Sequence, residues 1–211
     1  MPLSNRNSTK PLMITTRLLI VSAFFALLSF SGCAKKSDLT PAAQPAVSTT
    51  SQPAGSSSGN VSKVISVQRN EGKRVAEFSW TDENGKTVSF SDFSRNNVVL
   101  INFWATWCGP CKRELPDLIA LHEQYKDKDV RIIGISVDRD GDVLGLVRDF
   151  AAQANLKYPI VIDNGELEQV FGGIRGIPTT FFVNKNGEIV KKMIGLQSKE
   201  TFQAAIIAAG K

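Results

Sequence analysis

The sequence predicts an α/β domain in which helices flank a mixed sheet, and three features support this prediction. Residues 98–104 and 130–137 are apolar runs, typical of strands that are buried on both faces of a parallel sheet. A stretch with helical periodicity follows each of them. Asn84-Gly85 and Asn186-Gly187 each separate two strand-like segments, which is the pattern of a β-hairpin.

The first 32 residues have the pattern of a bacterial lipoprotein signal peptide. Three basic residues precede the apolar residues 18–30, a run too short for a membrane span, and two small residues then precede Cys33. This ending resembles the lipobox, where cleavage exposes a cysteine that is then lipidated. Two alternatives stay open: the segment is an uncleaved anchor, or it is cleaved in the ordinary way and Cys33 has no role.

All of these alternatives predict an extracytoplasmic domain, on the periplasmic side in a diderm. Ala34 rather than Asp follows Cys33, which favours the outer membrane there.

Residues 33–62 are rich in Ser, Pro and Ala, and they contain too little apolar surface to offset the entropy of folding. We expect a flexible tether there, followed by one folded domain over residues 63–211. Without the three basic residues of the leader, the formal charge falls from +5 to +2. This balance argues against a nucleic-acid partner.

The elements of the domain are predicted in order from apolar patterns, caps and turns. Asp142 or a neighbour, and Ser198, are the expected N-caps of two helices, the second of which ends before Gly210. We expect strands at 75–80, 86–90, 98–104, 130–137, 158–163, 179–183 and 188–192. We expect helical segments at 91–93, 109–126, 142–155, 166–171 and 198–209.

Cys108 and Cys111 stand where the strand 98–104 meets the helix 109–126, at a spacing that can close a small disulfide. The start of a helix favours negative charge, so the pKa of Cys108 should be lowered and its thiolate should be the nucleophile. Cys111 lies one turn further in and suits the resolving role. A purely structural disulfide is the alternative. A zinc site needs four ligands, which three cysteines and the single His122 do not favour, and no metal or other cofactor is expected.

Two separated motifs are similar to those of thioredoxin-fold proteins. The first runs from Phe103 to Cys111 and continues in Glu114-Leu115-Pro116, and the second is Gly176-Ile177-Pro178-Thr179. The N-terminal hairpin, a central helix-strand insert at about 141–172 and the tether resemble the TlpA/ResA-like branch of membrane-tethered thiol:disulfide oxidoreductases. The resemblance covers residues 64–211.

This resemblance implies roles for several residues. Pro178 would follow a cis peptide bond and face the cysteines, and the backbone of Ile177 would pair with a substrate strand. Trp107 would shape the docking surface. Glu114 would influence cysteine ionisation, although a solvated glutamate or an ion pair with Lys112 or Arg113 is an equal alternative. Thioredoxin has an aspartate where this chain has Asn102, and an amide cannot shuttle protons.

The predicted function is a membrane-tethered thiol:disulfide oxidoreductase that reduces protein disulfides through Cys108 and Cys111. Gly109-Pro110 is the thioredoxin dipeptide and favours a reductant, which would need a membrane thiol-reducing electron donor. Cytochrome c maturation is the commonest role in the family. One alternative is a thiol-dependent peroxidase, although Thr106 is two rather than three residues before Cys108. The other is a tethered binding module with a structural disulfide.

Two weaker features of the sequence are assigned to ordinary structure. Residues 138–142 hint at a calcium loop, but the glycine is misplaced and no glutamate closes the frame, so we expect a turn between a strand and a helix. His122 is expected to be a surface residue of its helix, and Trp104 a core residue.

Overall fold

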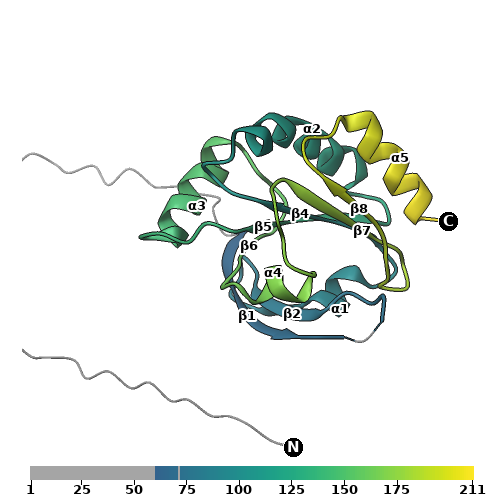
Figure 1. Ribbon diagram of the computed structural model, residues 1–211, viewed down its shortest axis with the longest axis horizontal. Coiled ribbons are helices and arrows are strands. Elements are labelled where there is room, and N and C mark those ends of the chain that lie inside the picture. The colour runs from purple at the N-terminus through teal and green to yellow at the C-terminus, as the bar shows by residue number, and fades with distance from the viewer. Residues whose placement is uncertain (1–59, 71) are drawn as a thin grey trace, which may run out of the picture. The chain divides into compact units, whose positions relative to one another are not determined.

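The computed structural model describes residues 60–70 and 72–211, which form a mixed sheet and helices on both of its faces (Figure 1). The strands are β1 (Val61–Gln68), β2 (Glu77–Thr81), β3 (Thr87–Ser89), β4 (Val98–Trp104), β5 (Val130–Ser136), β6 (Ile160–Ile162), β7 (Thr179–Val183) and β8 (Ile189–Ile194). The helices are α1 (Phe90–Ser94), α2 (Gly109–Tyr125), α3 (Val143–Gln153), α4 (Glu166–Val170) and α5 (Lys199–Ala209).

All the described strands belong to one sheet in the order β3-β2-β1-β6-β5-β4-β7-β8. Strands β1, β6, β5 and β4 run parallel to one another, whereas β7 pairs antiparallel with β4 and β2 pairs antiparallel with β1. The hairpins β2–β3 and β7–β8 form the two ends of the sheet. The predicted mixed sheet and both predicted hairpins are therefore confirmed.

Strand β1 was not predicted, and it moves the start of the folded domain. Val61 is buried and pairs with Ile160, so the strand begins two residues before the expected boundary at residue 63. The side chain of Asn60 already donates hydrogen bonds to the carbonyl oxygens of Leu156 (2.9 Å) and Tyr158 (2.7 Å). Most other residues of β1 are at least partly exposed, so its apolar pattern is weak and its partners in the sheet decide its structure.

The two faces of β4 supply two hydrophobic cores. Leu100 and Trp104 point to the face that α2, α3 and α5 cover, and they pack in the same cluster as Leu118 of α2. Ile101 and Phe103 point to the opposite face, toward α1, α4 and the aromatic residues of the β2–β3 hairpin (Figure 1). This arrangement explains why the whole run from 98 to 104 is apolar apart from one residue, since a central strand is buried on both faces.

Gly134 in the middle of β5 is required by close packing. A Cβ atom at this position would lie 2.7 Å from Cδ1 of Ile160 and 2.9 Å from Nε1 of Trp104. Both neighbours are buried, and Trp104 is fully so, as the sequence predicted. The glycine therefore leaves room for the Trp104 ring to pack close to β5.

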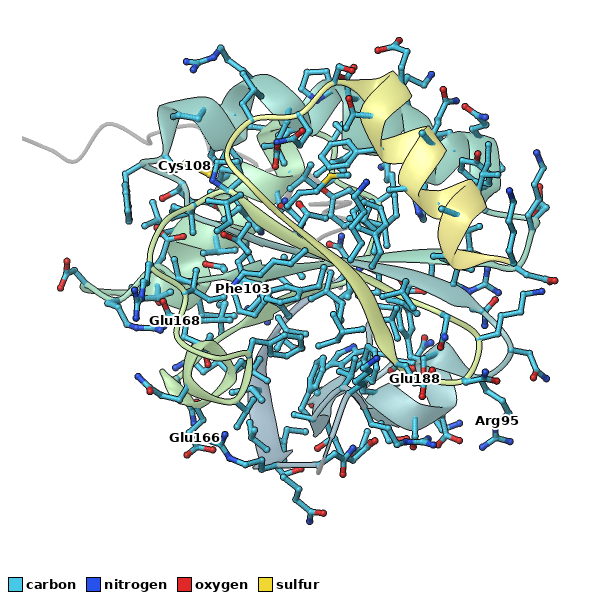
Figure 2. The ribbon with its side chains drawn as sticks, turned by 45° about the vertical axis from the view of Figure 1, so that its right-hand side comes forward. Arg95, Phe103, Cys108, Glu166, Glu168 and Glu188 are labelled. Carbon is cyan, nitrogen blue, oxygen red and sulfur yellow. A yellow bond between two sulfur atoms is a disulfide. The ribbon has the colours of Figure 1, made fainter. Side chains whose placement is uncertain are left out.

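The parallel strands give the domain two different edges. Cys108 follows the carboxyl end of β4, whereas Asn60 precedes the amino end of β1. Figure 2 shows Cys108 and Glu168 toward one edge of the sheet, and Arg95 and Glu188 toward the other. The carboxyl edge of a parallel sheet is where α/β proteins commonly place their ligands.

The predicted signal peptide, Cys33 and nearly all of the predicted tether lie outside the described residues. Among the residues that the structure does describe, no helix has both the length and the apolar character that a membrane span requires.

Candidate active site

Cys108 and Cys111 form a disulfide at the start of α2, with an S–S distance of 2.06 Å. Cys108 is the N-cap residue, and the backbone N–H of Cys111 donates to its Sγ atom at 3.1 Å. Cys108 is 4% exposed and Cys111 is fully buried. The sulfur nearer the surface therefore lies where the unpaired N–H groups of a helix terminus favour negative charge.

The residues between the cysteines explain why a helix begins here. Pro110 occupies the first helical turn, where its missing N–H has no partner to lose. The N–H of Lys112 donates to the carbonyl oxygen of Cys108 at 3.1 Å and begins the ladder of the helix. Pro116 lies inside α2, as expected, and its ring removes the N–H that would otherwise bond the carbonyl of Lys112.

The second motif of the sequence lies directly beside the disulfide. The peptide bond between Ile177 and Pro178 is cis, as the resemblance implied. The carbonyl oxygen of Ile177 is 3.8 Å from Sγ of Cys108, although 69 residues separate the two in the chain. Pro178 is buried, and its carbonyl oxygen accepts a hydrogen bond from the N–H of Gly195 at 2.8 Å. The segment before β7 therefore forms one wall of the site.

An open groove of about 300 Å³ adjoins this wall, and Trp107 stands on its rim with 68% of its surface exposed. The remaining lining residues are the apolar Val137, Ile174 and Ile177, the charged Arg139, Glu168 and Arg175, and Gly176. Arg139 forms ion pairs with Glu168 and with Asp163, the second at 3.1 Å. A lining that combines apolar and charged side chains suits a polypeptide segment.

Glu114 is buried on α2, three residues after Cys111, which rules out the solvated alternative. Its side chain is 1% exposed, and no lysine or arginine within 60–70 and 72–211 forms an ion pair with it. Its Oε1 atom accepts a hydrogen bond from Nδ2 of Asn102 at 2.8 Å, and Oε2 accepts one from the N–H of Gln197 at 3.4 Å. The ion pairs with Lys112 or Arg113 that the sequence left open are therefore absent.

Burial raises the pKa of Glu114 from 4.5 to about 7, because a carboxylate loses its hydration there. The hydrogen bonds from Asn102 and Gln197 act in the opposite direction, and the negative charge of Asp117 adds to the increase. Asn102 also donates to Oγ1 of Thr180 at 3.0 Å, so its amide is held between two partners. Glu114 can therefore gain or lose a proton near neutral pH.

Three residues, two of them in contact with the site, differ from or were missing in the sequence-based description. His122 is half-buried rather than a surface residue, because its ring packs against Tyr158 with centroids 5.8 Å apart, and burial lowers its pKa. Gln197 contacts Glu114 through its backbone, which no side-chain pattern reveals. Asp138 contacts the loop before Cys108, and its position just after a predicted parallel strand could have indicated this.

Known proteins are similar to this chain in sequence. Residues 72–192 match the AhpC/TSA family. The thiol-disulfide oxidoreductase ResA of Bacillus thuringiensis (strain Al Hakam) is 38% identical over 134 residues, which cover 63% of this chain and 74% of the relative. ResA of Bacillus subtilis (strain 168) is 32% identical over 129 residues, which cover 61% of this chain and 70% of the relative.

Solved structures agree with the sequence relatives. A thiol:disulfide interchange protein of the thioredoxin family from Chlorobium tepidum TLS is similar with a TM-score of 0.59 and 28% identity, over 67% of this chain and 99% of that one. StoA from Bacillus subtilis is similar with a TM-score of 0.55 and 29% identity, over 64% of this chain and 98% of that one. The chain thus belongs to the AhpC/TSA family and, within it, to the ResA/TlpA-like thiol:disulfide oxidoreductases with the thioredoxin fold.

Proposed function

We propose that this chain reduces disulfides of protein substrates outside the cytoplasm, with Cys108 as the nucleophile and Cys111 as the resolving thiol. One observation carries the proposal. The sulfur of Cys108 caps α2 and accepts a hydrogen bond from the N–H of Cys111, and it forms a disulfide with the more deeply buried sulfur of Cys111. A thiolate at this position is stabilised by the helix terminus and has a second sulfur within bonding reach.

The exchange takes place in two balanced steps. The Cys108 thiolate attacks one sulfur of the substrate disulfide, whose S–S bond breaks as a mixed disulfide forms and a substrate thiolate leaves. Cys111 then loses its proton and attacks Sγ of Cys108, which releases the second substrate thiol. Two electrons pass from the protein to the substrate, and the Cys108–Cys111 disulfide of the structure is the oxidised product.

Glu114 is proposed to assist the second step. It follows Cys111 by three residues on α2, and both side chains are buried on the same side of the helix. A carboxylate whose pKa is about 7 can accept the proton of Cys111 when that thiol attacks. In its ionised form it also opposes thiolate charge, which favours the disulfide over the dithiol and supports the proposed direction as a reductant.

Substrate binding is proposed at Trp107, Ile177 and Pro178. The exposed ring of Trp107 and the apolar lining residues of the adjoining groove suit side chains next to the target cystine. The backbone of Ile177, beside Cys108, would pair with an extended substrate segment. These contacts would hold the substrate disulfide over Sγ of Cys108.

Thiol–disulfide exchange is favoured over peroxide reduction. The peroxidase alternative needs a threonine three residues before the reactive cysteine, and Thr106 is two residues before Cys108. The hydroxyl of Thr106 moreover donates to Asp138 at 2.7 Å, so it is engaged in another contact.

A direct assay tests the proposed function. The fully reduced protein is expected to reduce a protein disulfide such as that of insulin, one disulfide per molecule of protein, while Cys108 and Cys111 become oxidised. Cys108→Ser should reduce the rate to that of the uncatalysed reaction, because the remaining thiol is buried. If the substrate stays oxidised and reductant changes only the stability of the protein, the disulfide is structural and the proposal is wrong.

The membrane location is a separate part of the proposal. The lipobox-like ending at Cys33 supports a lipid anchor, and the Ser/Pro/Ala-rich tether would hold the domain near a membrane thiol-reducing electron donor. Cytochrome c maturation is the role that the family suggests. We expect Cys33→Ser to release the protein from the membrane fraction and to abolish lipid labelling in cells. Retention with unchanged labelling would contradict the lipid anchor, and the exchange activity of the purified domain should be unaffected.

A further inference from the structure

Asp138 is a buried carboxylate beside the active-site loop that the exchange steps above do not use. It lies just past the end of β5, at the edge where β4 also ends, and it is only 3% exposed. A carboxyl group is tolerated at such a position only where hydrogen bonds replace its hydration. The partners of Asp138 therefore show which part of the protein it holds in place.

Two of these partners belong to a single residue of the active-site loop. The hydroxyl of Thr106 donates to Oδ1 of Asp138 at 2.7 Å, and the backbone N–H of Thr106 lies 3.1 Å from Oδ2. Thr106 precedes Cys108 by two residues. Hydrogen bonds to a carboxylate are stronger than those between neutral groups, so this pair of contacts constrains both the backbone and the side chain of the loop.

The other contacts fix the carboxylate and the loop to the sheet. The hydroxyl of Ser136, the last residue of β5, donates to Oδ2 of Asp138 at 2.8 Å. The N–H of Val137 donates to the carbonyl of Trp104 at 2.9 Å, so β4 and β5 stay paired up to the start of the loop. The N–H of Cys108 then donates to the carbonyl of Ala105 at 3.1 Å, which places Thr106 inside a tight turn.

We propose that Asp138 is a positioning residue for Cys108, and this inference rests on the function proposed above. By binding Thr106, Asp138 fixes the turn from Ala105 to Cys108. This turn then positions Sγ of Cys108 to accept the hydrogen bond from the N–H of Cys111. The same turn directs the ring of Trp107 outward, toward the substrate groove. Asp138 thus prepares the nucleophile without contacting the substrate.

Two substitutions at this contact test the proposal in the reduced, full-length protein. Asp138→Asn keeps the size of the side chain but replaces an acceptor oxygen with an amide donor, and Thr106→Val removes the hydroxyl without changing the charge. Each is expected to lower the rate of exchange with a model disulfide about tenfold. Each should also raise the pKa of the Cys108 thiol, read from the pH dependence of its alkylation, because Sγ leaves the helix terminus. Thr106→Ser keeps the hydroxyl and should restore both properties.

Asp142→Asn is the matched control. It removes the same charge from the same edge of the sheet, but the carboxylate of Asp142 caps α3 through the N–H of Gly145 and is not bonded to the loop. This variant should behave like the wild type. A fall in the Cys108 pKa in Asp138→Asn, with no change in Thr106→Val, would mean that Asp138 acts only through its charge and would overturn the proposal.

The proposed function and the positioning role of Asp138 can fail separately. If the wild type exchanges disulfides and both contact variants match it in rate and in thiol pKa, only the positioning role is wrong. If the wild type itself does not exchange disulfides, the proposed function is wrong.

Discussion

Cys111→Ser is expected to accumulate mixed disulfides that join Cys108 to substrate proteins. The first exchange step needs only Cys108, which lies at the helix start beside the substrate groove. The second step needs the sulfur of Cys111, whose Cα atom is 5.3 Å from that of Cys108, and a serine hydroxyl cannot replace it as a nucleophile. Non-reducing electrophoresis of cell extracts, followed by mass spectrometry, would reveal the trapped partners.

The companion variants make this result specific. Cys108→Ser and the double variant Cys108→Ser/Cys111→Ser should trap nothing, because the buried Cys111 cannot reach a substrate. Dithiothreitol should release the partners that Cys111→Ser has trapped. Equal amounts of adduct in Cys108→Ser and Cys111→Ser would show that Cys108 is wrongly assigned as the nucleophile. The absence of adducts in both variants would contradict the exchange mechanism.

Glu114→Gln is expected to remove a pH dependence of stability from the oxidised protein, in which the cysteines do not titrate. The pKa of Glu114 is 4.5 in the unfolded chain and about 7 in the folded protein. Between these values the folded state holds a proton that the unfolded state has lost, so the free energy of unfolding falls as pH rises from about 4.5 to about 7. At 1.36 kcal/mol per pH unit the loss approaches about 3 kcal/mol.

Denaturant unfolding from pH 4.5 to pH 8 measures this difference. The stability of Glu114→Gln relative to the wild type should rise across this range, since the amide never ionises and still accepts the hydrogen bond of Asn102. Glu123→Gln is the control, because Glu123 is an exposed glutamate of the same helix, and it should keep the wild-type dependence. Parallel curves for Glu114→Gln and the wild type would contradict a raised pKa at Glu114.

Local sequence predicted most of the fold because its elements carry strong local patterns. The run 98–104 is buried on both faces, and the structure forms β4 over the same residues. Ser198 caps α5 through the N–H of Thr201, as its position before a helical stretch indicated. Strand β1 was missed because a half-exposed strand has little apolar pattern, and its pairing with β2 and β6 decides its structure.

The same contrast applies to the site. Cys108 and Cys111 are three residues apart at a predicted strand–helix junction, so their proximity follows from local geometry alone. The placement of Pro178 beside them came from a family resemblance, since no local rule joins positions so far apart in the chain. The environment of Glu114 could not be predicted, because its partners Asn102 and Gln197 come from β4 and from the segment between β8 and α5.

Local sequence patterns were enough to predict the α/β class, the order of most elements and the cysteine pair at the start of a helix, because periodicity, caps and short spacings act within a few residues. Which polar groups become buried together depends instead on how distant elements pack in three dimensions. No local pattern shows that Glu114 and Asp138 are buried, because their burial is set by packing between elements distant in the chain. Burial determines both the raised pKa of Glu114 and the hydrogen bonds by which Asp138 fixes the active-site loop, because desolvation and hydrogen bonding depend on every neighbour in space.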